Sequence, residues 1–193
     1  STSAKYYQTT VFPQANFDEL QITELQKEYV KTMRELMKDK KFYPDANSTL
    51  RVAYGKVNDY IPRDGVEYSH YTTLDGIMQK ENPNDEEFIV PAKLKELYAK
   101  KDYGAYAAKD GKLHVAFTAS NHTTGGNSGS PVLNGKGELI GINFDRNWEG
   151  TMSDVMYNPN QCRNITLDVR YTLFLIDKFA GAGYLLNEMK IVK

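Results

Sequence analysis

The sequence predicts a mainly β fold with flanking helices, in which short strands form a small antiparallel barrel. After residue 48 the chain consists of short alternating or apolar runs separated by Gly, Asp and Asn, as in strands joined by turns. Helical spacing of apolar residues is limited to one segment near the N-terminus and two short stretches further on. Apolar residues make up 40% of the 193 residues, which is sufficient for a buried core.

The N-terminal segment is predicted to form an amphipathic helix over Phe17–Lys41. Apolar residues three and four positions apart would share one face of this helix: Ile22, Leu25, Tyr29, Met33 and Leu36. Turn-forming residues over Pro44–Ser48 end the pattern. We therefore expect residues 1–45 to be a helical arm and residues 46–193 to form the barrel and a C-terminal helix.

Strands and helices alternate unevenly along the rest of the chain. Strands are predicted at Leu50–Ile61, Tyr68–Thr73, His114–Ala119, Ser130–Asn134, Leu139–Asp145, Ile165–Tyr171 and Glu188–Val192. Helices are predicted at Pro91–Lys100, which has Pro in its first turn, and at Thr172–Ala180, which Gly181 closes.

Charge and composition exclude several classes of partner. The net charge of −1, from 24 basic and 25 acidic residues, provides no general attraction for nucleic acid or an anionic membrane. The longest apolar run is shorter than the roughly 18 to 20 residues that span a bilayer, so no membrane span is expected. No His, Cys or carboxylate cluster has the spacing of metal ligands, and we expect neither a metal nor a cofactor.

The first residue of the chain and its single cysteine are also informative. The chain begins at Ser1 without an initiator Met or a signal-peptide pattern, so we expect that Ser1 follows a cut in a longer precursor. The single cysteine, Cys162, has no partner for an internal disulfide and is expected to be a structural thiol.

The segment with the strongest chemical signal is Thr123–Val132, which reads TTGGNSGSPV. A serine flanked by glycines on a tight turn presents its hydroxyl outward, and the glycines leave backbone N–H groups open toward a developing oxyanion. A Gly/Ser-rich stretch can also be a simple flexible turn. Here the turn lies between two predicted strands, which favours Ser128 as a nucleophile.

The same residues carry a family resemblance. Gly126–Val132, followed by Leu139–Ile142, resembles the nucleophile loop and next strand of chymotrypsin-clan serine peptidases. Residues 143–150, 161–165 and 168–171 resemble the bacterial dipeptidyl peptidases of types seven and eleven. The resemblance implies a double β-barrel with an inserted helical domain, and a homodimer in the periplasm or at the surface of a Gram-negative bacterium. The implied partners are peptides with a free N-terminus.

A serine nucleophile needs a histidine base and a carboxylate. All three histidines, His70, His114 and His122, precede Ser128, which excludes the order Ser, Asp, His. The resemblance implies the chymotrypsin order with both partners far upstream, so each histidine is expected to be an ordinary strand or loop residue. The chain alone is therefore expected to be inactive. The resemblance also implies that the N–H groups of Gly126 and Ser128 form the oxyanion hole.

Residues near the end of the strand Leu139–Asp145 are the candidates for substrate recognition. The resemblance implies that the next position separates subgroups: glycine accepts apolar side chains, and arginine selects Asp or Glu. Arg146 stands there, and a guanidinium matches a carboxylate with two parallel bonds. The alternative is a surface arginine paired with Asp145 or Glu149.

Three further residues complete the predicted substrate site. The resemblance implies that Asp145 binds the substrate's α-ammonium group, although it could be an exposed carboxylate at a strand end. Phe144 and Asn127 are also expected to contact substrate. Asn127 is neutral where trypsin-like enzymes have an aspartate that pairs with a newly cut N-terminus, so no zymogen activation of that kind is expected.

Two other functions remain open on the sequence alone. Glutamyl endopeptidases have a similar serine motif and also cut after acidic residues, although residues 144–149 and the long helix argue against that class. A barrel that serves only for peptide binding or dimerisation, with an idle serine, is the second alternative.

Overall fold

The computed structural model describes residues 2–40, 42 and 48–192. The chain divides into two compact units, Ser1–Thr49 and Leu50–Lys193, and each is described by itself. The predicted turn over Pro44–Ser48 lies outside the described residues except for Ser48. The predicted domain boundary after residue 45 falls in the same segment and stays a prediction.

The first unit contains a long helix that begins earlier than predicted. It consists of α1 (Thr2–Tyr6), a π-helical turn (Tyr7–Val11) and α2 (Phe12–Leu36). The predicted helix over Phe17–Lys41 therefore starts too late and ends too late. Pro13, which lacks the N–H that a helix interior requires, is the second residue of α2 and lies close after the π-helical turn. Most of the predicted apolar face is exposed: Ile22, Leu25, Tyr29 and Leu36.

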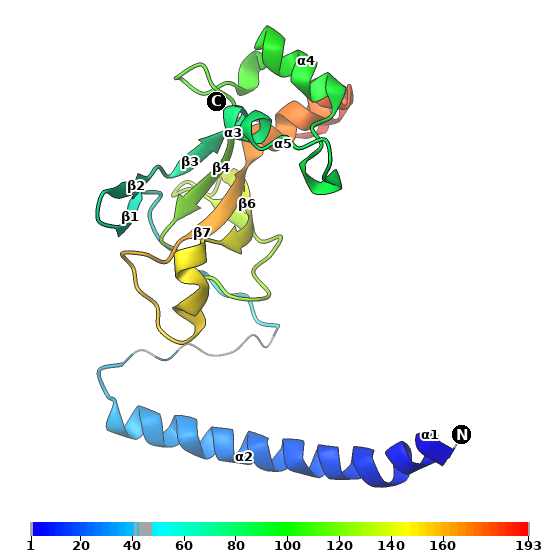
Figure 1. The fold of residues 1–193 in the computed structure, drawn as a ribbon. Helices are drawn as coiled ribbons and strands as arrows, with labels where there is room; N and C mark the ends of the chain where they lie inside the picture. The colour runs from blue at the N-terminus through cyan, green and yellow to red at the C-terminus, as the bar shows by residue number, and fades with distance from the viewer. Residues whose placement is uncertain (1, 41, 43–47, 193) are drawn as a thin grey trace. The chain divides into compact units, whose positions relative to one another are not determined.

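The second unit is built on a five-stranded antiparallel sheet with the order β3-β4-β7-β6-β5 (Figure 1). Its strands are β3 (Tyr71–Thr73), β4 (His114–Ala119), β5 (Pro131–Leu133), β6 (Leu139–Arg146) and β7 (Asn164–Asp168). A separate hairpin joins β1 (Tyr60–Arg63) to β2 (Val66–Tyr68). With its helices, the unit is a mixed α/β domain. Closure of the sheet into a barrel stays a prediction.

The prediction is most accurate for the strands around the serine motif. β4 coincides with the predicted His114–Ala119, and β6 extends the predicted Leu139–Asp145 by Arg146 alone. β5 is the predicted strand Ser130–Asn134 without its first and last residues. These strands have partners on both sides or a tight connection, so their alternating side chains find the two faces that the pattern requires.

Three other predicted strands are wrong wholly or in part. Most of Leu50–Ile61 is irregular, with one bridge between Val57 and Ala119, and only its last two residues belong to β1. The predicted Tyr68–Thr73 is divided between β2 and β3. No strand forms over Glu188–Val192. An alternating segment forms a strand only where a neighbouring strand supplies hydrogen bonds. Among the described residues, these three segments lack a continuous partner.

β7 ends earlier than the predicted Ile165–Tyr171 because a helix begins at its end. The Asp168 carboxylate accepts a hydrogen bond from the N–H of Arg170 at 2.9 Å and caps α5 (Val169–Phe174). A π-helical turn, Leu175–Phe179, continues the helix. The helix predicted over Thr172–Ala180 is thus confirmed in place but begins too late.

Helices and a buried cluster lie at one end of the sheet, where Figure 1 shows α3, α4 and α5 together. α4 (Ala92–Lys100) matches the predicted helix, whereas the sequence does not predict α3 (Leu74–Gln79). The remaining short helices are Glu86–Phe88, Gly104–Tyr106, Trp148–Asp154 and Gly183–Glu188. The cluster that these elements bury consists of Leu74, Val90, Leu94, Tyr103, Leu113, Tyr171 and Phe174.

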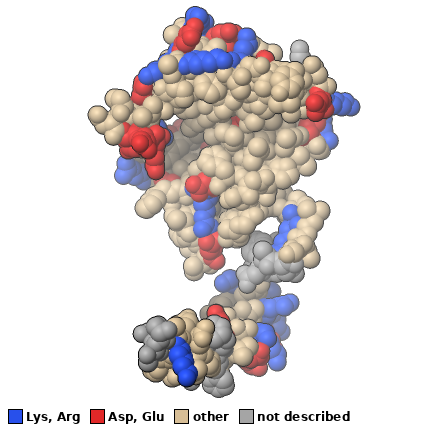
Figure 2. All heavy atoms as spheres, turned by 90° about the vertical axis from the view of Figure 1, so that its right-hand side faces the viewer, with Lys and Arg blue, Asp and Glu red and all other residues tan. Residues whose placement is uncertain are grey.

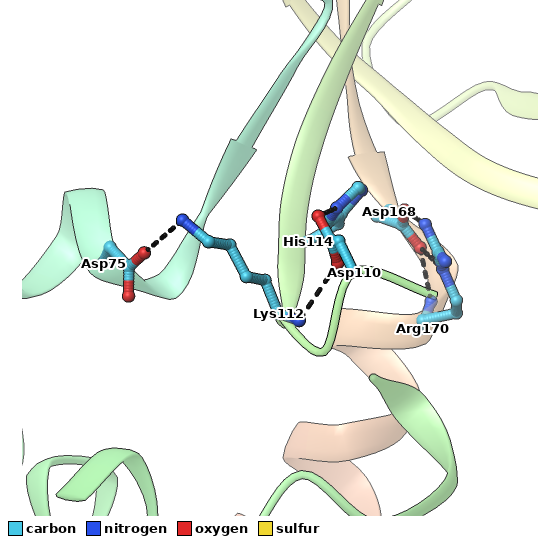
Figure 3. Close-up of polar contacts among 6 residues, drawn as sticks. All are labelled: Asp75, Asp110, Lys112, His114, Asp168 and Arg170. Carbon is cyan, nitrogen blue, oxygen red and sulfur yellow. Dashed lines mark hydrogen bonds and ion pairs between the residues drawn. The ribbon is translucent and has the colours of Figure 1, made fainter. Parts of the chain in front are cut away.

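Polar pairs surround the same end of the sheet (Figure 3). Three carboxylates each contact a basic side chain there: Asp110 with His114, Asp75 with Lys112, and Asp168 with Arg170. Asp168 is buried, and the guanidinium of Arg170 donates to both of its oxygens, at 2.9 and 2.5 Å. A buried carboxylate needs such a partner, so this pair fixes the junction of β7 and α5.

The surface carries charges of both signs. On the face in Figure 2, Lys and Arg side chains lie among Asp and Glu side chains and are not gathered in one field. Within the described ranges, no helix has the length and apolar content needed to cross a membrane. Among the same residues, no group of three or more His, Cys, Asp and Glu side chains is placed to hold a metal ion.

Candidate active site

Ser128 lies exposed on a compact turn between β4 and β5. The N–H of Asn127 donates to the carbonyl of Thr124 at 3.1 Å, and the Asn127 side-chain oxygen accepts from the N–H of Thr124 at 3.0 Å. Gly126 and Gly129 have φ angles of +98° and +82°, in the region that favours glycine. The glycines on either side of Ser128 are therefore required by the backbone of the turn, which presents the hydroxyl outward.

Two N–H groups of this turn are available to a ligand. The N–H groups of Asn127, Gly129 and Ser130 donate to backbone carbonyls at 2.8 to 3.1 Å. In the part of the chain that the structure describes, those of Gly126 and Ser128 have no recorded acceptor. This is the pattern that an oxyanion hole requires, with donors fixed by the turn and not used by it.

The turn is attached to β6 through Asn143. The Asn143 carbonyl accepts from the N–H of Gly129 at 2.8 Å, and its N–H donates to the carbonyl of Ser130 at 2.9 Å. Its side-chain amide donates to the carbonyl of Asn127 at 3.1 Å. Three bonds from one residue therefore fix the backbone on both sides of Ser128. The sequence reasoning missed Asn143, because its bonds to the turn join residues that lie far apart in the sequence.

Asn143 is held in turn by a second buried amide. The amide nitrogen of Asn164, on β7, donates to the side-chain oxygen of Asn143 at 3.0 Å and to the hydroxyl of Thr166 at 3.2 Å. All three side chains are buried. Buried hydrogen bonds hold side chains in one arrangement, so the two bonds from the Asn164 amide nitrogen support the position of the serine turn. Among the described residues, the Asn164 side-chain oxygen has no hydrogen-bond partner.

The hydroxyl of Ser128 points at the strand that ends in Arg146. It donates to the carbonyl of Phe144 in a long contact of 3.4 Å. The pairing of β6 with β7 is irregular between Asn143 and Asp145, which places Phe144 at a bulge. The structure thus brings the predicted nucleophile and the predicted substrate-binding strand together at this point.

Arg146 lies at the end of β6 and is only partly exposed, with 23% of its side-chain surface open. Its guanidinium donates to both carboxylate oxygens of Asp154, at 2.8 and 2.5 Å, and to the hydroxyl of Ser153 at 2.8 Å. The hydrogen bond from Arg146 is the main reason that the pKa of Asp154 is well below its usual range. The alternative pairing with Asp145 or Glu149 side chains is not what the structure shows; the partner is Asp154.

The other predicted substrate residues are exposed or committed to the turn. Asp145 is exposed, and its carboxylate accepts from the N–H of Arg146 at 2.8 Å. Phe144 is 47% exposed. The side chain of Asn127 shapes the turn through its bond to Thr124. Asp145 and Phe144 thus remain open to a ligand, whereas Asn127 has a structural role whatever its contact with substrate.

Each histidine has a partner other than Ser128. Nδ1 of His70 lies 2.7 Å from the carboxylate of Asp59, and Nε2 of His114 lies 2.9 Å from Asp110. Nε2 of His122 lies 3.0 Å from the carbonyl of Ser153. These contacts agree with the expectation of ordinary strand and loop histidines.

Comparison with known proteins identifies the family. The chain belongs to the peptidase S46 family, whose model matches residues 7–191. An "Asp/Glu-specific dipeptidyl-peptidase" of Capnocytophaga gingivalis is 55% identical over 186 residues, which cover 96% of this chain and 26% of that protein. A "Dipeptidyl-peptidase 7" of Phocaeicola vulgatus is 52% identical over 169 residues, covering 88% of this chain and 23% of that protein.

Solved structures give the same result. The crystal structure of Porphyromonas endodontalis DPP11 in complex with the dipeptide Arg-Glu matches with a TM-score of 0.84 and 50% identity, covering 96% of this chain and 26% of that one. The complex of the same enzyme with Arg-Asp matches with a TM-score of 0.85 and 49% identity, covering 97% and 27%. The chain thus spans about a quarter of the length of the relatives that it matches.

Proposed function

We propose that this chain supplies the nucleophile and the specificity residue of a serine dipeptidyl peptidase that releases N-terminal dipeptides with Asp or Glu in the second position. The observation that carries the proposal is the contact of the Ser128 hydroxyl with the strand that ends in Arg146. Family membership supports the reaction, and the printed names of the relatives support the acidic specificity.

The proposed reaction begins with attack of the Ser128 oxygen on the carbonyl carbon of the substrate's second residue. A histidine takes the serine proton, and the N–H groups of Gly126 and Ser128 bind the oxyanion. The peptide C–N bond breaks, the histidine protonates the leaving amine, and an ester to Ser128 remains. Water then hydrolyses the ester and releases the dipeptide. We propose that this histidine and its aspartate lie outside residues 1–193, because His70, His114 and His122 have other partners.

Substrate recognition is assigned to the residues around the end of β6. The guanidinium of Arg146 binds the acidic side chain through parallel N–H bonds. The exposed carboxylate of Asp145 binds the free α-ammonium group, which limits release to dipeptides. Phe144 provides an exposed apolar surface beside them, and Asn127 contacts substrate from the turn. The charges of Asp145 and Arg146 are therefore complementary to the α-ammonium group and to the acidic side chain of the substrate.

The proposal extends to the whole protein in the form that the sequence resemblance implies. The five-stranded sheet belongs to the second barrel of a chymotrypsin-like pair, and α2 belongs to a helical domain inserted in it. The enzyme is a homodimer in the periplasm or at the surface of a Gram-negative bacterium. The exposed apolar residues of α2 are consistent with a helix that packs against further protein.

A paired assay separates this function from a glutamyl endopeptidase. The full-length peptidase is given a fluorogenic dipeptide ending in Glu, with its amine free or acetylated. We expect hydrolysis of the free form alone, because the acetylated amine has no charge for Asp145. Equal cleavage of both forms would identify an endopeptidase.

A labelling experiment tests the role of the serine. A fluorophosphonate probe should label the full-length wild-type peptidase and not its Ser128→Ala variant. Labelling that persists in the variant would assign the nucleophile to another residue, and no labelling of either would indicate a barrel without catalysis.

A further inference from the structure

The carboxylate of Asp154 holds the guanidinium of Arg146 in a bidentate pair. Nη1 and Nη2 of Arg146 donate to the two oxygens of Asp154 at 2.8 and 2.5 Å, and Nη1 also donates to the hydroxyl of Ser153 at 2.8 Å. Two parallel bonds fix the plane of a guanidinium as well as its position. Such a geometry distinguishes this pair from an ordinary exposed ion pair, which holds two flexible side chains only loosely.

These bonds leave one edge of the guanidinium open. An arginine has five N–H donors, and three of those of Arg146 are used by Asp154 and Ser153. Among the described residues, Nε–H and the second hydrogen of Nη2 have no recorded partner. These two donors lie on the same side of the planar group and form a second fork for a carboxylate. Arg146 can therefore bind Asp154 and a substrate carboxylate at once.

Two contacts relate the Arg146 site to the segment that carries Ser128. The Ser128 hydroxyl donates to the carbonyl of Phe144, two residues before Arg146 on β6, at 3.4 Å. Nε2 of His122, in the segment between β4 and the serine turn, lies 3.0 Å from the carbonyl of Ser153, the neighbour of Asp154. The residues that hold Arg146 are thus joined to both sides of the site.

We propose that Asp154 is a positioning residue for acidic specificity, which holds Arg146 so that its open edge faces the acidic side chain of the substrate at a fixed place relative to Ser128. The inference rests on the proposed function of Arg146. The opposite role for Asp154 would be competition with the substrate for Arg146. In that case, removal of the Asp154 carboxylate would strengthen acidic specificity, because a substrate carboxylate would no longer have to displace Asp154.

The test measures kcat/KM of the full-length peptidase for free-amine dipeptides ending in Glu or Leu. Asp154→Asn keeps the size of the side chain but removes its charge. Ser153→Ala is the matched control, since it removes one bond and leaves the ion pair in place. Asp154→Glu tests whether a carboxylate restores the function. The ratio of the two substrates is taken on one preparation, so any loss of folded enzyme cancels.

We expect Asp154→Asn to lower the Glu/Leu ratio about tenfold or more, mainly through a higher KM for the Glu substrate, since charge-assisted bonds orient the binding group. Ser153→Ala should change the ratio less than about threefold, and Asp154→Glu should recover part of the loss. A ratio that is unchanged or increased in Asp154→Asn overturns the inference. If Arg146→Gly removes the preference but Asp154→Asn does not, the inference alone fails. If the wild type has no preference for Glu over Leu, the proposed function fails and the inference with it.

Discussion

Removal of the Asn143 side chain is expected to weaken both the fold and the catalytic turn. Asn143→Ala deletes the bond to the carbonyl of Asn127, at 3.1 Å, and the bond from the amide of Asn164, at 3.0 Å. Each such bond contributes about 1 kcal/mol net, and a buried amide left without its acceptor costs about 1 to 3 kcal/mol. Because Asn164 is buried, we expect a loss of about 2 to 4 kcal/mol in the free energy of unfolding.

The same change should reduce kcat more than it changes KM. The backbone bonds of Asn143 to Gly129 and Ser130 remain, so the turn still forms, but Ser128 is held less closely. A displacement of about 1 Å in a reacting group can reduce the rate about a hundredfold. Calorimetry and steady-state kinetics on the full-length peptidase measure the two effects. Asn160→Ala is the control, since Asn160 is exposed. A stability change under about 0.5 kcal/mol together with an unchanged kcat would refute the role assigned to Asn143.

Three further predictions concern the sheet and its end. Gly141→Ala should prevent normal pairing of β6 with β7, because a Cβ there would lie 2.4 Å from Cγ2 of Thr166. We expect a lower melting temperature, and an unchanged one would show that the strands can separate at little cost. Asp168→Ala should cost about 1 to 3 kcal/mol, because it removes the N-cap of α5 and the charged partner of Arg170, whose side chain is 42% exposed and can be hydrated. A loss below about 0.5 kcal/mol in chemical unfolding would contradict this. Hydrogen bonds from Lys112 to Asp75 and from His114 to Asp110 lower the pKa of both carboxyl groups. Their contribution to stability is therefore present above about pH 4 and is lost as the pH falls through the lowered pKa. Urea unfolding at pH 6 and pH 3 measures this contribution, and equal stability at both pH values would be contrary to expectation.

The parts of the fold that the sequence predicts are those set by local pattern. β4 and β6 are short, largely apolar runs bounded by turn-forming residues, and both lie inside the sheet, so the local pattern locates them. α3 contains Gly76, which weakens a helix, and its formation depends on burial of Leu74 in the core cluster. The segment Leu50–Ile61 shows the converse case: its residues favour a strand, but no neighbouring strand pairs with most of it. Tertiary partners decided both outcomes.

The same distinction between local pattern and tertiary partners applies to the residues of the candidate site. Ser128 and Gly126 could be predicted because the chemistry needs glycines around an exposed serine, and the positive φ of Gly126 agrees with that reasoning. Arg146 was predicted through the family resemblance. Asn143 and Asp154 could not be predicted, because their importance lies in bonds to residues distant in the sequence or in a separate short helix. A lone Asn in a strand or Asp near a loop carries no signal of such partners.

The central claim is that Arg146 selects acidic substrates for a reaction at Ser128. The most direct test compares kcat/KM for free-amine dipeptides ending in Glu and in Leu, using full-length peptidase with Arg146 intact and with Arg146→Gly. The account predicts that Glu is strongly preferred by the intact enzyme and that the preference falls by about 30-fold or more in the variant, as expected for loss of a partly buried charge partner. An intact enzyme that prefers Leu, or a variant that keeps the preference for Glu, would contradict it.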